Sequence, residues 1–148
     1  MKRFEFPLEP VLRLKNQLLE LEEARLAQLQ RTEEDLLEQR QRLLDEAREQ
    51  EQFLIGSDSV PGDLLTSYAA FQSSVRDRFT RISAAIEDCR RSQEEQRGKI
   101  RAIRVDLKLI DKLKKRQFGE WTRLLDKETE ELTGEAFLNR LVRDMPRK

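Results

Sequence analysis

The sequence predicts an all-α protein in which two long helices fold back on each other as an antiparallel coiled-coil hairpin, with the second helix longer. Three observations predict this fold. The 148 residues are 39% charged and 37% hydrophobic, with only five glycines and four prolines, a composition typical of long solvated helices. Apolar residues recur at steps of three and four residues. The only cluster of turn-forming residues lies between the two periodic stretches.

The first helix is expected over about residues 8–55. Pro7 and Pro10 lie before or within its first turn, where proline is tolerated. Its apolar positions follow two registers, the first made of Val11, Leu14, Leu18 and Leu21 and the second of Leu26, Leu29, Leu36, Leu43, Ala47 and Leu54. The eleven-residue step from Leu18 to Leu29 predicts a stutter, which locally unwinds a supercoil.

The hairpin loop is expected over about residues 56–62, with Asp63 as the candidate N-cap of the second helix. The second helix is expected over about residues 63–132, with candidate bends at Gly119 and Gly134 and a short helix or tail over 135–148. Its seam keeps an unbroken three-four alternation through Phe79, Ile82, Ile86, Cys89, Gln93, Gln96, Ile100, Ile103, Leu107 and Ile110. We therefore expect a single coiled-coil hairpin domain.

Folding the chain at this loop pairs residues whose numbers sum to about 118. Gln93 and Gln96 then lie near Glu22 and Arg25, which predicts a loosened, polar layer beside the stutter. Residues after about 113 extend beyond the first helix. Trp121 in this overhang has no first-helix partner, so we expect local packing with Phe118 and Leu125, or a role as a docking anchor.

Charge is unevenly distributed, although 29 basic and 29 acidic side chains balance overall. Residues 1–56 carry nine basic and thirteen acidic side chains, whereas residues 90–118 carry eleven basic and four acidic ones. Two interpretations of this basic belt (residues 90–118) stay open: pairing with the acidic first helix, or contact with an acidic partner. Nucleic acid is disfavoured because the belt lacks interleaved aromatic residues and the net charge is zero.

The composition also excludes most catalytic chemistry. The chain has no histidine and one cysteine, Cys89, which excludes Cys/His zinc sites and Ser-His or Cys-His nucleophile pairs. The glycines are scattered, so no phosphate-binding loop is expected. We therefore expect no catalytic, cofactor-binding or metal-binding residues, no enzyme activity, and a protein that acts by contacting other proteins. The lone thiol fits a reducing compartment, and no apolar run reaches the ~20 residues of a membrane span.

The opening stretch Phe4-Glu5-Phe6-Pro7-Leu8-Glu9-Pro10-Val11-Leu12-Arg13-Leu14-Lys15 resembles the start of the FliJ family of the bacterial flagellar export apparatus. The stretch Tyr68-Ala69-Ala70-Phe71 is similar to the aromatic pair that begins the family's second helix. The resemblance implies a stalk protein that engages the hexameric export ATPase and the cytoplasmic domain of the export-gate membrane protein, and escorts export chaperones. It further implies a cytoplasmic protein, peripherally associated with the inner membrane at the flagellar base and required for motility.

The resemblance also implies contact residues. The export-gate surface falls on Gln39, Leu43, Glu46, Gln50, Phe71, Val75, Arg78 and Ile82. At this surface the chain departs from the family pattern at Glu46 and Gln50, which replace aromatic residues, and at Arg78 and Ile82. The ATPase contact is expected at Arg101, Arg104, Lys108, Lys112, Lys115 and Trp121. The alternatives are the equivalent stalk of a virulence-type secretion system and a general coiled-coil scaffold.

Overall fold

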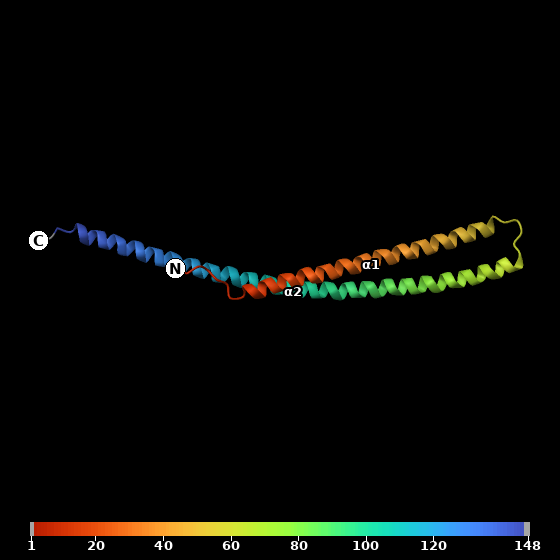
Figure 1. The fold of residues 1–148 in the computed structure, drawn as a ribbon, viewed down its shortest axis with the longest axis horizontal. Helices are drawn as coiled ribbons and strands as arrows, with labels where there is room; N and C mark the ends of the chain where they lie inside the picture. The colour runs from red at the N-terminus through yellow and green to blue at the C-terminus, as the bar shows by residue number, and fades with distance from the viewer. Residues whose placement is uncertain (1, 147–148) are drawn as a thin grey trace. The chain divides into compact units, whose positions relative to one another are not determined.

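A computed structural model describes residues 2–146, which form two helices joined by one connection (Figure 1). Helix α1 spans Glu9–Ile55 and helix α2 spans Gly62–Asp144, and α2 is the longer of the two, with 83 residues against 47. The two helices pack against each other, and no strand occurs between residues 2 and 146. The predicted all-α hairpin with a longer second helix is confirmed.

The chain divides into two compact units, which we describe separately. The terminal unit contains residues 2–18 and 103–146, and so joins the start of α1 to the C-terminal part of α2. The loop unit contains Leu19–Ala102, and so includes the rest of α1, the connection and the first half of α2. In each unit, segments far apart in the sequence lie against each other.

The connection between the helices covers residues 56–61. At its start, the Gly56 N–H donates to the Gln52 carbonyl at 3.0 Å. At its end, the Pro61 carbonyl accepts hydrogen bonds from the N–H groups of Leu64 and Leu65 at 3.1 and 3.2 Å. Because α2 already begins at Gly62, Asp63 lies inside the first turn and not at the expected N-cap position.

Helix α2 continues without interruption to Asp144, beyond the expected end near residue 132. Gly119 and Gly134 lie inside this helix, and no described glycine has a positive φ angle. A lone glycine costs only about 1 kcal/mol in a helix interior, and the neighbouring glutamate, leucine and lysine residues favour helix. The separate segment expected over residues 135–148 is therefore part of α2 as far as Asp144, and residues 147–148 lie outside the described residues.

The inner face of α2 agrees with the predicted seam from Ile86 to Ile103, whereas Phe79 at the loop end of that seam is 36% exposed. Its buried side chains are Ile86, Cys89, Gln93, Gln96 and Ile100 in the loop unit and Ile103 in the terminal unit. Ile86 is the most deeply buried of them, with 1% of its surface exposed. The unbroken three-four alternation of the sequence therefore marks the positions that α2 turns toward α1.

The start of α1 packs differently from the prediction. The side chains of the expected first register remain between 37% and 65% exposed: Val11, Leu14, Leu18 and Leu21. The less exposed positions are Leu12 and Lys15 in the terminal unit and Leu19 and Glu22 in the loop unit. They continue at steps of three and four residues into Leu26 and Leu29, so the predicted stutter is wrong. Because the α2 seam is continuous, α1 stays in phase with it and accepts polar residues on its inner face.

Candidate functional site

The loop unit contains a hydrogen-bonded polar layer between the helices. The Gln96 side-chain amide donates to the Glu22 backbone carbonyl at 2.9 Å and also to the Glu22 carboxylate. The same carboxylate accepts a hydrogen bond from Arg25 at 2.9 Å. Gln96 and Glu22 are both buried. The expected proximity of Gln96, Glu22 and Arg25 is confirmed. The layer was expected to be loosely packed, but its side chains are hydrogen-bonded to each other.

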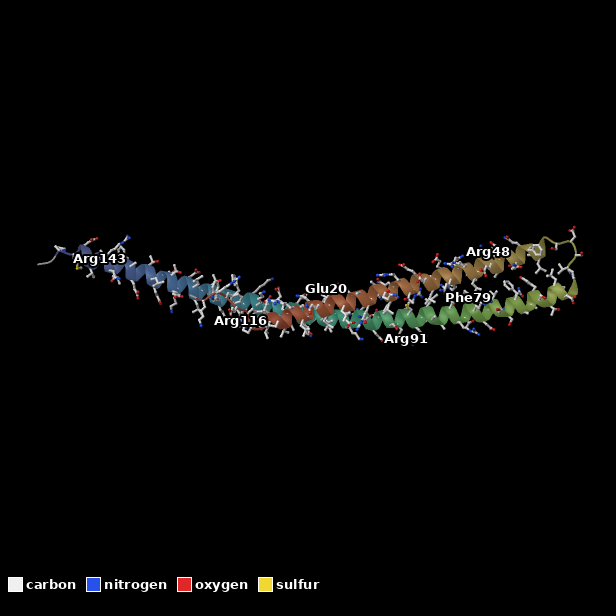
Figure 2. The ribbon with its side chains drawn as sticks, in the orientation of Figure 1. Glu20, Arg48, Phe79, Arg91, Arg116 and Arg143 are labelled. Carbon is white, nitrogen blue, oxygen red and sulfur yellow. The ribbon has the colours of Figure 1, made fainter. Side chains whose placement is uncertain are left out.

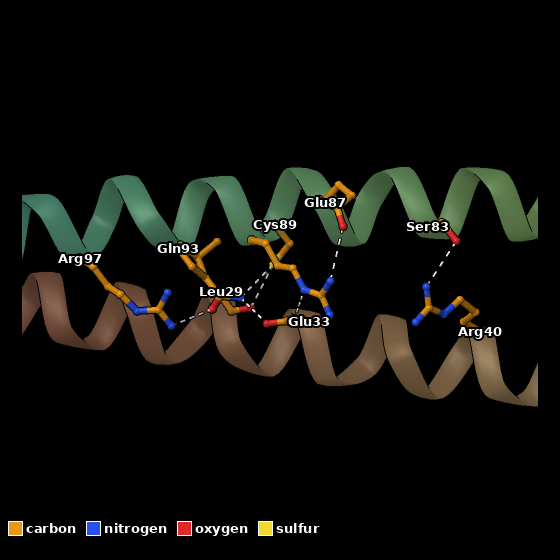
Figure 3. Close-up of polar contacts among 9 residues, drawn as sticks. Leu29, Glu33, Arg40, Ser83, Glu87, Cys89, Gln93 and Arg97 are labelled. Carbon is orange, nitrogen blue, oxygen red and sulfur yellow. Dashed lines mark hydrogen bonds and ion pairs between the residues drawn. The ribbon is translucent and has the colours of Figure 1, made fainter.

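A second set of polar contacts lies nearer the loop (Figure 3). Glu33 of α1 accepts hydrogen bonds from the Arg90 Nε–H and from the Gln93 side-chain amide of α2, both at 2.7 Å. These two donors hold the pKa of Glu33 below its ordinary value of 4.5. The Gln93 carbonyl oxygen accepts a longer bond from Arg97 at 3.4 Å. Gln93 therefore bonds to Glu33 and not to the Glu22–Arg25 pair, because it lies one turn nearer the loop than Gln96 does.

Cys89 occupies a small position in this inner face. Its side chain is buried and its thiol donates to the Leu29 backbone carbonyl at 3.2 Å (Figure 3). Every buried side-chain nitrogen and oxygen in the described part of the chain has a hydrogen-bond partner. The polar layers therefore satisfy their own groups, as buried polar groups in folded proteins do.

Five of the eight residues expected to contact an export gate line one groove in the loop unit. The groove has a volume of about 210 Å³. The residues of the expected gate surface that line it are Gln39, Leu43, Glu46, Arg78 and Ile82. Leu43 is buried at its base, whereas Gln39, Glu46 and Arg78 are exposed at its rim. The structure thus brings these residues together from both helices and separates an inner apolar layer from an outer polar one.

The other three expected residues lie nearer the connection. Phe71 and Val75 are half-buried and Gln50 is exposed. A hollow of about 300 Å³ there is lined by Gln50, Phe53, Leu54, Leu64, Ser67, Tyr68 and Phe71. The Tyr68 and Phe71 rings lie 6.4 Å apart between centroids. Phe53 and Leu64 add exposed apolar surface that the sequence reasoning missed, since both lie outside the seam positions next to the turn.

The basic belt is paired with α1 at few positions. Arg90 pairs with Glu33 in the loop unit, and Lys114 pairs with Glu9 at 2.9 Å in the terminal unit. Five further ion pairs lie within α2, and they join Arg91 to Asp88, Arg97 and Arg101 to Glu94, Lys115 to Asp111, and Arg116 to Glu120. Figure 2 labels Arg91 and Arg116, whose side chains are largely exposed. Pairing between the helices thus accounts for a minority of the positive charge.

The six residues expected to contact an ATPase are distributed over both units. Arg101 belongs to the loop unit, whereas Lys108, Lys112, Lys115 and Trp121 belong to the terminal unit, as does Arg104. Lys108 and Lys112 are exposed and make no ion pair with any residue between 2 and 146. Within the expected set, Lys108 and Lys112 are thus charged residues without an ion-pair partner among residues 2–146.

Trp121 has an intramolecular partner that the sequence reasoning missed. The non-helical residues 2–8, here called the N-terminal segment, lie against α2 in the terminal unit. The Phe4 ring lies 5.3 Å from Phe118, edge to face, and 5.8 Å from Trp121. Phe118 and Trp121 stack on each other at 5.7 Å. The Trp121 indole N–H donates to the Lys2 carbonyl at 3.3 Å. The expected packing on Phe118 is present, and Trp121 in addition contacts Lys2 and Phe4, which precede α1.

A second anchor of the N-terminal segment is Phe6, which is buried. The Lys114 ammonium lies 5.9 Å from the centroid of its ring, within the range of a cation–π contact, and pairs with Glu9. Phe4 and Phe6 alternate with Arg3 and Glu5 along a non-helical segment, and both rings lie against α2. This alternation in the opening stretch is the signal from which the contact could have been predicted.

For residues 2–5 of this segment, the free-energy cost of ordering the backbone is similar in size to the free energy gained from its contacts. Ordering the backbone of residues 2–5 costs about 1–2 kcal/mol per residue. Burial of the Phe4 side chain contributes at most about 1.5–3 kcal/mol. Its two ring contacts contribute about 0.5–1.5 kcal/mol each, and one hydrogen bond contributes about 0.5–1.5 kcal/mol. These contributions are together of the same order as the cost of ordering residues 2–5.

No group of three or more histidine, cysteine, aspartate and glutamate side chains in the described chain could hold a metal ion. Neither described helix contains a stretch long and apolar enough to cross a membrane.

Comparison with known proteins identifies one family. Residues 4–142 match the family model described as Flagellar FliJ protein. No curated protein and no solved structure matches the chain. The matched range includes the opening stretch, all of α1, α2 as far as residue 142, and the contact surfaces described above.

Proposed function

We propose that this chain, which belongs to the FliJ family, is a stalk protein of flagellar export. The family is a non-enzymatic component of the flagellar protein export apparatus, and the match over residues 4–142 is the observation that carries the proposal. The stalk engages the hexameric export ATPase with the terminal unit and the cytoplasmic domain of the export gate with the loop unit. It also escorts export chaperones, and it works in the cytoplasm at the inner face of the membrane.

The groove of the loop unit supports the contact with the export gate. Gln39, Glu46 and Arg78 are exposed beside the apolar side chains of Leu43 and Ile82. An apolar base with a polar rim is the usual anatomy of a protein interface. The exposed rim residues make the direct contacts, and buried Leu43 supports the groove from below.

The terminal unit supports the contact with the ATPase. Lys108 and Lys112 are exposed and unpaired within residues 2–146, and the apolar side chains of Val11 and Leu14 are exposed in the same unit. Unpaired cations speed association with an acidic surface, and exposed apolar residues supply the burial that holds it. The terminal unit thus offers both components of a docking surface.

The test is stimulation of ATP hydrolysis by the purified export ATPase when this protein is added. We expect the wild-type chain to bind and stimulate the ATPase, and the Lys108→Glu/Lys112→Glu variant to bind it more weakly, most clearly at low salt. Arg48→Glu is the matched control, because Arg48 is an exposed arginine of the loop unit (Figure 2). Absence of binding and of stimulation by the wild-type chain would refute the ATPase contact and favour a general scaffold.

The gate contact needs its own experiment. Arg78→Glu should weaken binding of the purified cytoplasmic domain of the export gate, because Arg78 lies at the rim of the loop-unit groove. Arg91→Glu is the control, since Arg91 is an exposed arginine on the same helix that does not line that groove. Equal affinities of both variants and the wild-type chain would refute this assignment.

A further inference from the structure

The C-terminal part of α2 is exposed on all sides in the terminal unit. Every residue from 126 to 146 is exposed. This stretch nevertheless carries large apolar side chains, and Leu138 and Val142 keep 60% and 68% of their surface exposed. Nearer α1, Val105 and Leu109 of the same helix are 55% and 60% exposed. Apolar surface gathered in this way is typical of a face that another protein covers.

These apolar residues belong to one stripe of α2. The stripe runs through residues 105–142 by steps of three and four residues, which keep successive side chains on one side of a helix. Its two ends are apolar. Its middle is charged and carries Arg116, Glu120, Lys127 and Glu131 in this order, so a basic and an acidic residue alternate first and then exchange places.

Two copies of this stripe are complementary when they run antiparallel. If residues whose numbers sum to about 247 face each other, Arg116 meets Glu131, and Glu120 meets Lys127. A two-fold axis repeats each contact, because residue i of one copy meets residue j of the other and the reverse. Lys127 and Glu131 make no ion pair with another residue between 2 and 146, so both can pair with a second copy.

The same register brings the apolar ends together. Leu109 then faces Leu138, and Val105 faces Val142. All four side chains are more than half exposed in the single chain. Their burial between two copies supplies the hydrophobic contribution to association, while the charged middle fixes the register and the antiparallel direction.

Helix α1 widens the apolar face at one end of the stripe. Val11 and Leu14 directly precede the inner positions of α1, and Leu109 directly precedes Ile110 of the α2 seam. Because the two right-handed helices run in opposite directions, side chains that precede inner positions lie on the same side of the pair. Residues 134–142 of a second copy can therefore contact both helices of the terminal unit.

We propose that two copies of this chain associate as an antiparallel, two-fold dimer through residues 105–142 of α2. The paired stretch is ~57 Å long at 1.5 Å per residue, which exceeds the three to four heptads that specify a coiled coil. The charged middle layers limit its strength, and we expect a dimer Kd of roughly micromolar. The dimer covers Val11 and Leu14, so it competes with the proposed ATPase contact and goes beyond the stalk function.

The experiment is sedimentation velocity of the full chain over a range of protein concentrations, in which the wild-type chain should change from monomer to dimer. Leu138→Asp should raise the dimer Kd at least about ten-fold, because it places a carboxylate in an apolar contact that occurs twice. Leu132→Asp is the matched control. Leu132 is also a 60% exposed leucine of α2, and it lies about 120° away around the helix.

A charge exchange tests the register. Arg116→Glu and Glu131→Arg should each raise the dimer Kd about five-fold at low salt, because like charges then face each other. The double variant Arg116→Glu/Glu131→Arg should restore the wild-type Kd. The two positions are about 22 Å apart along one helix, so restoration reports a contact between copies.

A wild-type chain that stays monomeric up to about 1 mM would overturn the proposal. Equal effects of Leu138→Asp and Leu132→Asp on the dimer Kd would overturn the assignment to this stripe. A double charge variant as weak as the two single variants would overturn the register. Circular dichroism of each variant verifies that the helices are retained. The assay contains no ATPase, so its result is independent of the proposed stalk function.

Discussion

Replacing Gln96 with leucine should destabilise the protein more than replacing its partner Glu22 with leucine. In Gln96→Leu, the Glu22 carboxylate stays buried with 6% exposure and keeps Arg25, but loses its donor from α2. A lost hydrogen bond to a buried charged group costs about 1.5–3 kcal/mol. In Glu22→Leu, the Gln96 amide keeps the backbone carbonyl of residue 22 as acceptor at 2.9 Å. The cost should then stay below about 1 kcal/mol.

The double variant tests whether Gln96→Leu destabilises the protein because Glu22 loses its hydrogen-bond donor, or because the substitution disturbs the packing in general. With both residues changed to leucine, no buried charge or amide is left without its partner, and stability should return to or exceed that of the wild-type protein. At about 2–4 °C per kcal/mol, thermal melting followed by circular dichroism should place Gln96→Leu about 3–12 °C below the wild type. Gln30→Leu controls for added apolar surface, because Gln30 is exposed on α1. A Gln96→Leu protein as stable as the wild type, or a double variant less stable than both single variants, would refute the reasoning.

Three further predictions concern other parts of the helices. The hydrogen bonds from Arg90 and Gln93 lower the pKa of Glu33 below 4.5, so their stabilisation is present above that pH and is lost as the pH falls through the lowered value. Arg90→Ala should therefore reduce the drop in melting temperature between about pH 5 and pH 3. An unaltered drop would argue against this contact. Ile103→Asp should bury an unpaired charge and cost several kcal/mol, whereas Val105→Asp at a 55% exposed position should change stability by about 0.5 kcal/mol or less; equal melting temperatures would disprove the register. Gly119→Ala should stabilise α2 by about 1 kcal/mol in urea unfolding, because an added Cβ meets no atom within 4 Å; destabilisation would point to a bend that alanine cannot adopt.

The agreement between sequence and structure is best in α2. Its inner residues, from Ile86 to Ile103, alternate at steps of three and four without interruption, so a single helix face explains all of them. The connection is equally well marked, because glycine, serine, aspartate and proline gather there and nowhere else. The candidate gate residues were found through a family resemblance, and periodicity alone indicated only which of them face α1.

The start of α1 shows where sequence reasoning fails. Between residues 11 and 22 the helix carries two stripes, and the more apolar one, with Val11 and Leu14, is left exposed. Hydrophobicity alone selects the wrong stripe. The stripe that is turned inward contains Lys15 and Glu22, and each finds a partner on α2: Asp106 at 3.0 Å for Lys15, and Gln96 for Glu22.

The two helices, their connection and the inner face of α2 from Ile86 to Ile103 are predictable from the residues alone, because these features depend on local propensity and on the period of one apolar pattern. The inward face of α1 and the residues that cover Trp121 follow only from the packing of distant segments. Both outcomes depend on groups more than ninety residues apart in the chain, such as Lys15 with Asp106 and Phe4 with Trp121. A pattern within one helix carries no information about the partner that its polar residues will meet, and so the polar inner positions of α1 became predictable only once α2 lay beside them.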